Sequence, residues 1–272
     1  MSFLKSWAWK REGRLDIQRF YAPYNHPLNE QTILARNGDQ KTIYVEQAKS
    51  NSKTVWDSSI VLAKYLELLF NKDSSKFTSS TKCLEIGCGC GLPGLLLSYV
   101  GCKVVFTDLP EVLHVVQDSI KRNQFTNCQV TSLKWGSDVT QVKQYVPFDI
   151  VIATDTMFIL EEVDSLFETI MAVSGDTTQI YFAYGRNRYA EELFLEKMKQ
   201  AKLYVREIPS EELDDTYQCS DVTVLCITRF PQQVPQQKSE EEEEIVQETP
   251  SEEQPSNSKR KSESIESGTK KQ

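Results

Sequence analysis

The residues CLEIGCGCGLPG, Cys83 to Gly94, are expected to join a buried strand to a helix. The apolar run that ends at Ile86 indicates a strand, and the apolar run after Gly91 indicates a helix. The glycines between them let the backbone turn sharply and approach a ligand closely. Because the N-terminus of a helix favours negative charge, the sequence predicts an anion-binding turn at this point.

Two glycine patterns overlap in this turn, and they are typical of different cofactors. Gly-x-Gly-x-x-Gly, read from Gly89, fits dinucleotide binding, in which the anion is a pyrophosphate. Glu-x-Gly-x-Gly-x-Gly, read from Glu85, fits S-adenosylmethionine binding, in which the anion is the methionine carboxylate. The glycines alone do not separate these cofactors. Glu85 has a clearer use with the second, as an acceptor near the methionine ammonium, although a solvent-facing glutamate is the alternative.

Strand and helix patterns alternate after this turn, which predicts a parallel sheet covered by helices on both faces. The five expected strands are residues 82–86, 103–107, 128–133, 148–154 and 178–184. Residues 203–208 and 221–230 are two further strands without a periodic helix between them, so we expect an antiparallel pair at the sheet edge. Seven strands in this arrangement predict an α/β, Rossmann-like class I methyltransferase sheet and not the six-stranded dinucleotide fold.

The chain upstream and downstream of this sheet has a different character. Residues 31–47 place Asn37-Gly38 between two alternating runs, which indicates a β-hairpin, and residues 55–70 have helical apolar spacing. The C-terminal residues are too poor in apolar side chains to offset the entropy of ordering. We therefore predict an N-terminal segment with a β-hairpin (1–54), a methyltransferase domain (55–230) and a disordered charged tail (231–272).

Composition excludes several classes of protein. The chain has 39 acidic and 31 basic residues, a formal net charge of -8, which argues against binding to nucleic-acid backbones. Two histidines and the lack of a paired Cys-x-x-Cys argue against a metal site, and the seven cysteines are expected to be reduced. With no signal peptide and no run of about 20 apolar residues, we expect a cytoplasmic protein. The KRK run at residues 259–261 is interpreted as solvated charge, with a nuclear-import signal as the alternative.

Ligands of an open parallel sheet bind beyond the carboxyl ends of its strands, so the residues there are candidates for the site. Asp108 ends the second strand and can accept hydrogen bonds from both ribose hydroxyls of either cofactor; capping a helix expected from Glu111 is the alternative. Trp135 follows the third strand and can stack on the adenine ring, or lie in the core. Asp138 is a further candidate, as an acceptor for the adenine amino group.

The fourth strand ends at Thr154, and Asp155 and Phe158 follow it as an Asp-x-x-Phe motif. The Asp155 carboxylate can attract a cationic amine while the Phe158 ring packs on the aliphatic stem of that amine. A carboxylate also keeps an ammonium protonated, and only the neutral amine is nucleophilic, so the proton must leave through the nearby sulfonium charge, desolvation or water. Positioning for in-line displacement then does most of the catalysis. A helix N-cap aspartate with a core phenylalanine is the alternative.

Taken together, residues 30–230 resemble the seven-strand protein-lysine methyltransferases of methyltransferase family 16. The most specific segment is TVWDSSIVLAKYLE at residues 54–67, and LEIGCGCGLPGL, VVFTDLPEVL, LKWG and TDTMF follow in the family's order. The resemblance implies that Asp155 and Phe158 form the substrate motif. Together with the glycine pattern, it implies S-adenosylmethionine contacts from Trp56, Glu85, Gly87, Cys88, Gly89, Gly91, Asp108, Trp135 and Thr154.

This chain departs from the family pattern near the expected acceptor. Relatives commonly have tyrosine where this chain has Phe158, so a hydroxyl that could bond the substrate amine is missing, and they commonly have alanine at position 154. Relatives often have a glutamate after the fifth strand, whereas Tyr184 is followed here by Gly185. The substrate is therefore less constrained by the sequence than the cofactor.

The resemblance implies a monomeric S-adenosylmethionine-dependent enzyme that methylates a lysine ε-amine of a non-histone protein, such as a chaperone, an AAA ATPase or a translation factor. No nucleic acid, membrane or metal is expected as a partner. A small-molecule N-methyltransferase and a non-catalytic adaptor that keeps the cofactor fold are the alternatives. A dinucleotide oxidoreductase is the remaining reading of the glycine turn.

Overall fold

The structure is a computed structural model that describes residues 30–34, 40–47, 53–137, 139–185, 190–215, 217–218 and 220–231, with side chains from residue 43 onward. These residues belong to the first of two compact units, 1–232 and 233–272. The Asn37-Gly38 turn, Asp138 and the tail from residue 232 lie outside the described residues. The division of the chain into three predicted regions stays a prediction.

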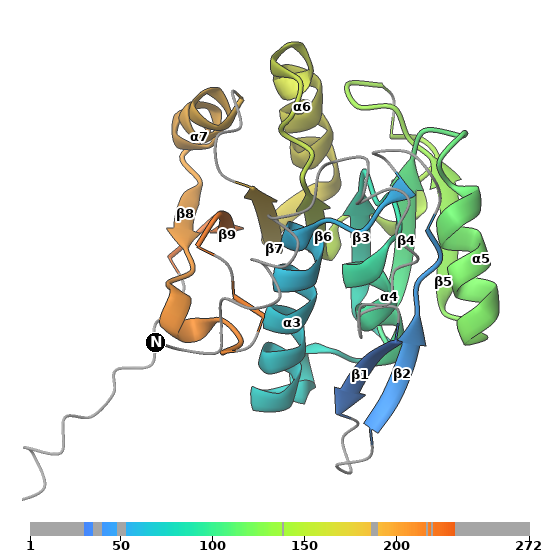
Figure 1. Cartoon of the computed structure of the whole chain (residues 1–272). Helices are drawn as coiled ribbons and strands as arrows, with labels where there is room; N and C mark the ends of the chain where they lie inside the picture. The colour runs from blue at the N-terminus through green and yellow to red at the C-terminus, as the bar shows by residue number, and fades with distance from the viewer. Residues whose placement is uncertain are drawn as a thin grey trace, which may run out of the picture. The chain divides into compact units, whose positions relative to one another are not determined.

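A seven-stranded sheet forms the centre of the described part of the chain, in the order β5-β4-β3-β6-β7-β9-β8 (Figure 1). Within this sheet, strands β3 to β7 pair in parallel, and β9 pairs antiparallel with both β7 and β8. This confirms the predicted α/β sheet with an antiparallel terminal pair. The strands are β3 Lys82–Ile86, β4 Lys103–Asp108, β5 Cys128–Ser132, β6 Phe148–Thr154, β7 Ser174–Gly185, β8 Tyr204–Glu207 and β9 Val222–Thr228.

The helices that cover the sheet have the bounds α3 Asp57–Lys72, α4 Leu92–Tyr99, α5 His114–Asn123, α6 Val163–Val173 and α7 Glu191–Gln200. Short 3-10 turns lie at η3 Ser74–Lys76, η4 Lys143–Tyr145, η5 Leu160–Glu162 and η6 Ser210–Glu212. The helix expected from Glu111 begins at His114 instead, because residues 111–113 form a turn. None of the described helices is long and apolar enough to span a bilayer.

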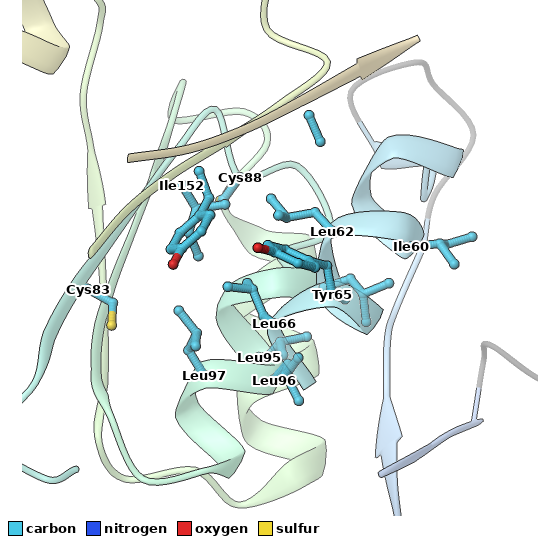
Figure 2. Close-up of a cluster of buried hydrophobic side chains, with 14 of the residues drawn as sticks. Ile60, Leu62, Tyr65, Leu66, Cys83, Cys88, Leu95, Leu96, Leu97 and Ile152 are labelled. Atoms are coloured by element: carbon cyan, nitrogen blue, oxygen red, sulfur yellow. The ribbon is translucent and has the colours of Figure 1, made fainter. Parts of the chain in front are cut away.

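Alternation along the strands divides the core between the two faces of the sheet. Cys83, Phe106 and Ile152 face α3, α4 and α5, whereas their sequence neighbours Leu84 and Val105 face α6 and α7. Figure 2 shows the first face, where side chains of α3 and α4 meet over the sheet, among them Tyr65, Leu66, Leu95 and Leu97. Both faces of the sheet are covered by buried apolar side chains, which explains why the strands read as continuous apolar runs.

The predicted N-terminal hairpin is confirmed by the antiparallel pairing of β1 Glu30–Leu34 with β2 Gln40–Tyr44. The end of β2 is tied to α5, because the Tyr44 N–H donates to Asn123 Oδ1 at 2.9 Å and Asn123 Nδ2 donates to the Tyr44 carbonyl oxygen at 2.6 Å. The Glu46 N–H also donates to the Ser119 hydroxyl at 2.8 Å. These bonds hold the end of β2 and the residues directly after it against α5.

Candidate functional site

The turn after β3 has the backbone conformation that its glycines were expected to allow. Gly87, Gly89 and Gly91 have φ angles of 61°, 52° and 74°, in the left-handed region that side chains disfavour. A Cβ at Gly87 would lie 2.9 Å from Thr156 Cγ2 and 3.2 Å from Trp135 Cζ2. The turn therefore touches the segments that follow β6 and β5, and the ends of three strands meet at one place.

Backbone hydrogen bonds tie this turn to β4. The Cys88 N–H donates to the Thr107 carbonyl oxygen at 2.9 Å, and the Gly89 N–H donates to Asp108 Oδ2 at 2.8 Å. The Cys88 side chain is buried, and burial raises the pKa of its thiol well above the usual range. Cys88 is thus a small buried residue of the turn, and it is not poised as a thiolate.

Glu85 is fully buried, so the solvent-facing alternative is wrong. Its Oε2 accepts a hydrogen bond from the Gly94 N–H at 3.0 Å in the first turn of α4, and its Oε1 has no hydrogen-bond partner among the described residues. Burial, with the nearby Asp108 charge adding to it, raises the pKa of the Glu85 carboxyl to about 8. The contact of Glu85 with a methionine ammonium stays a prediction.

Glu85→Gln is expected to change how stability depends on pH. Because the folded-state pKa of Glu85, about 8, exceeds its ordinary value of 4.5, the folded protein keeps a proton that the unfolded chain has lost. The free energy of unfolding should therefore fall as the pH rises from 4.5 to about 8. Below pH 4.5 the proton is bound in both states, so Glu85 gives the free energy of unfolding no pH dependence there. Glutamine is neutral throughout, so the variant should lose this decline.

Denaturant titrations of ligand-free wild type and Glu85→Gln at about pH 5 and about pH 8 measure the difference. We expect the variant to gain stability relative to wild type at the higher pH. Burial also raises the pKa of Asp108, but that group is present in both proteins and cancels in the comparison. The same pH dependence in both proteins would show that Glu85 is ionised in the fold.

Asp108 ends β4 with both carboxylate oxygens turned to the backbone of the site. Oδ2 accepts from the Gly89 N–H, and Oδ1 accepts from the Leu109 N–H at 2.7 Å. Since α5 begins only at His114 and no side chain caps it, the helix-cap alternative is wrong. Asp108 is half-buried beside the glycine turn, where a carboxylate has lone pairs left for ribose hydroxyls.

S-adenosylmethionine fits the residues that meet here. The N-terminus of α4 suits the methionine carboxylate, and the Asp108 carboxylate suits the ribose hydroxyls. The half-buried Trp135 ring lies against Gly87, where it suits the adenine. The unpartnered Oε1 of Glu85 can take one more donor. Trp56 is the N-cap residue of α3 and is half-buried, and its contact with the cofactor stays a prediction.

The acceptor motif follows β6, the strand that pairs with β3 on the side away from β4. Asp155 has a φ angle of 51°, a strained conformation for a residue other than glycine, and its N–H donates to the Ala183 carbonyl oxygen at 2.8 Å. Its Oδ1 accepts from the Gly185 N–H at 3.1 Å, and its Oδ2 accepts from the Ser58 hydroxyl. The helix after Asp155 starts well downstream, so the N-cap alternative for this residue is wrong.

Ser58 and Ser59 are site residues that the sequence reasoning missed. Ser58 is buried and bonds Asp155, and the Ser59 hydroxyl lies 2.9 Å from Thr154 Oγ1, so the first turn of α3 holds the end of β6. The available signal was the pair of serines directly after Trp56-Asp57, in the most specific segment of the resemblance. Local pattern could not pair them with residues nearly 100 positions away.

Phe158 is not a core residue, because 57% of its surface is exposed. Ile159 and Leu160 after it are also exposed, so an apolar run faces solvent directly after the Asp155 carboxylate. The structure thus brings Asp155, Thr154, Gly87 and Trp135 to one edge of the sheet. A direct approach of the Phe158 ring to a substrate stays a prediction.

Ser58→Ala is expected to lower the turnover number about tenfold, because it removes one hydrogen bond to a charged carboxylate. Ser58 acts through Asp155, so S-adenosylmethionine affinity should stay unchanged while kcat falls. Ser75→Ala, which removes a serine-to-aspartate hydrogen bond to Asp73 in the turn after α3, is the matched control and should keep wild-type turnover. An equal loss in both variants, or a parallel loss of cofactor affinity, would remove the positioning role from Ser58.

Comparisons with known proteins identify the family of this chain. The model of the lysine methyltransferase family matches residues 36–201. EEF1A lysine methyltransferase 3 of Xenopus tropicalis is 30% identical over 131 residues, 47% of this chain and 55% of that protein. Protein-lysine methyltransferase METTL21E of Mus musculus is 31% identical over 153 residues, 54% and 61% of the two chains. Histone-arginine methyltransferase METTL23 of Homo sapiens is 34% identical over 119 residues, which cover 43% of this chain and 60% of that protein.

Among solved structures, the 16S rRNA N2 G1207 methyltransferase RsmC of T. thermophilus, in complex with AdoMet and guanosine, superposes with a TM-score of 0.50. It is 18% identical and covers 74% of this chain and 50% of its own, so the likeness concerns the fold alone. The chain spans about 55–61% of the length of the first curated relatives it matches.

The sheet order, the glycine turn and the carboxylates at the strand ends define a class I methyltransferase with S-adenosylmethionine as its cofactor. The dinucleotide reading of the turn is thereby wrong. Within this class, the chain belongs to the lysine methyltransferase family, methyltransferase family 16, as its sequence resemblance implied.

Proposed function

We propose that this protein transfers a methyl group from S-adenosylmethionine to a lysine ε-amine of another, non-histone protein. The observation that carries the choice of a protein acceptor is the exposed apolar run from Phe158 to Leu160 directly after Asp155. A macromolecular acceptor would cover this run, whereas a small acceptor would leave it in water. The name of one relative, EEF1A lysine methyltransferase 3, supports a translation factor as the first acceptor to test.

The residues of the chain have separate tasks in this proposal. When bound, S-adenosylmethionine would supply a sulfonium methyl group for transfer to the amine nitrogen, with a neutral thioether as the leaving group. Asp155 attracts the amine and orients it, and Ser58 with the Gly185 N–H keeps the carboxylate in place. The amine proton leaves to water, since a carboxylate beside an ammonium favours the protonated form.

Arginine is the second candidate acceptor, because human METTL23, named a histone-arginine methyltransferase, is 34% identical to part of this chain. The geometry favours lysine. A guanidinium binds a carboxylate best as a two-pronged fork, and both Asp155 oxygens already accept hydrogen bonds from the protein. A lysine ammonium is a point charge that needs only one remaining lone pair.

The test uses the full chain, S-adenosylmethionine with a radiolabelled methyl group, and a cell lysate as the source of acceptors. We expect label in one or a few protein bands, and mass spectrometry should place the added methyl groups on lysine. Methylated arginine would support the second candidate. Label in low-mass material only would support a small-molecule enzyme, and no transfer despite cofactor binding would support an adaptor.

A further inference from the structure

A groove of about 600 Å³ lies between η5 and the helix α7. Its lining consists of Leu160, Glu192, Leu193, Leu195, Glu196 and Lys199. Two of its apolar lining residues, Leu160 and Leu193, are 48% and 40% exposed. We call this surface the η5–α7 groove.

The groove continues the acceptor end of the site. Among the described residues, seven large apolar side chains are exposed, and Phe158, Ile159, Leu160 and Leu193 are four of them. Three of these four form the run that leads from Asp155 into the groove wall. Isolated exposed apolar side chains are common on protein surfaces, whereas a cluster of them marks an interaction site. This cluster therefore indicates a docking surface.

The walls of the groove are held in place before any partner arrives. Tyr184 at the end of β7 donates a hydrogen bond to Glu191 Oε1 at 2.8 Å, which anchors the start of α7. Lys197 of α7 forms an ion pair with Asp164 of α6, and its Nζ lies 5.7 Å from the Phe167 ring centroid. The two helices contact each other, and Figure 1 shows them as neighbours at the same end of the molecule. The entropic cost of ordering this surface when a partner binds is therefore small.

Among the described residues, the charge around the groove is acidic. Residues 158–164 and 190–200 contain six acidic side chains and two basic ones, a net charge of -4. One of the two basic side chains, Lys197, forms an ion pair with Asp164. The other, Lys199, lines the groove together with Glu192 and Glu196, so the lining has one more negative than positive side chain. Such a surface attracts a basic segment and repels an acidic one.

We propose that the η5–α7 groove docks the methyl-acceptor protein through a segment with a large apolar side chain flanked by lysine or arginine residues. The apolar side chain lies on Leu160 and Leu193, and the basic residues meet Glu192 and Glu196. This docking places a nearby lysine of the same segment at Asp155. The inference rests on the proposed function, because it assigns the groove to the acceptor of that reaction.

The experiment measures initial rates of methyl transfer into the most strongly labelled protein band of the lysate, with the full chain and radiolabelled S-adenosylmethionine. Glu192→Lys and Leu193→Asp change the groove, and Asp118→Lys, on the exposed side of α5, is the matched charge reversal. We expect both groove variants to lose about tenfold in rate, with S-adenosylmethionine affinity as in wild type. Asp118→Lys should transfer as wild type does.

A second readout uses synthetic peptides that cover the labelled lysine. Peptides in which the basic neighbours or the nearest large apolar residue are replaced by alanine should be methylated more slowly by wild type. The Glu192→Lys variant should no longer respond to the basic neighbours. Wild-type rates in both groove variants, or an equal loss of cofactor affinity, would overturn the docking inference. A wild-type protein that labels no protein band would instead remove the proposed function, and the docking inference with it.

Discussion

Asp155→Asn is expected to lower methyl transfer to protein about 100-fold, because it removes the negative charge that attracts the acceptor amine. Asparagine keeps the size of the side chain, and it tolerates the left-handed backbone conformation that Asp155 adopts. Its oxygen can still accept from the Gly185 N–H, and the Ser58 hydroxyl can rotate to accept from its amide. The variant therefore changes charge with little change in shape.

The measurement pairs transfer rates with S-adenosylmethionine affinity from calorimetry. Affinity should stay within about twofold of wild type, since Asp155 faces the acceptor in the proposed reaction. Asp118→Asn on α5 is the control for removal of one negative charge, and it should transfer normally. Near-normal transfer by Asp155→Asn would mean that another group attracts the amine, and Asp155 would then be a structural residue.

Asp108→Ala is expected to weaken S-adenosylmethionine binding about 100-fold, because the two predicted charge-assisted hydrogen bonds from the ribose hydroxyls to this carboxylate would be lost. The substitution also removes the acceptor for the Gly89 N–H and so loosens the turn itself. Both effects act on the cofactor, so methyl transfer should recover in part when the cofactor concentration is raised. This recovery distinguishes the roles of Asp108 and Asp155. Raising the cofactor concentration should not restore methyl transfer in a variant that lacks the Asp155 carboxylate.

Calorimetry of S-adenosylmethionine binding and thermal unfolding with and without cofactor are the two measurements. Wild type should be stabilised by S-adenosylmethionine, and Asp108→Ala should show little stabilisation at the same concentration. Glu111→Gln removes a neighbouring, exposed carboxylate and should bind the cofactor as wild type does. Unchanged affinity in Asp108→Ala would show that the ribose is held elsewhere.

Much of the fold could be predicted from local pattern. The strands at 82–86 and 148–154 have the predicted bounds, because a buried parallel strand is a short, continuous apolar run. The terminal antiparallel pair followed from the lack of a helix between its strands. The start of α5 was predicted three residues early, since Glu111 to Leu113 are compatible with a helix yet form a turn.

The site could be predicted only where its residues end strands. Asp108 ends one buried strand and Asp155 follows another. Since parallel strands have their carboxyl ends at one edge of the sheet, the sequence could predict that these two residues lie near each other. The burial of Glu85 and the exposure of Phe158 could not be predicted. Both depend on which other segments pack against the residue, and the residue type alone does not indicate that. Ser58 was missed for the related reason that its partner lies far along the chain.

The resemblance of several motifs to a known family implied the cofactor class. The sequence by itself determined the order of strands and helices along the chain and the glycine turn. These depend on period and on backbone freedom, which are properties of short segments. Only the tertiary structure decided three contacts. Ser58 of α3 donates to Asp155, the Gly94 N–H of α4 donates to the buried Glu85, and Leu160 and Leu193 line one groove. Such contacts arise when packing brings distant segments together, and no local pattern encodes their distances.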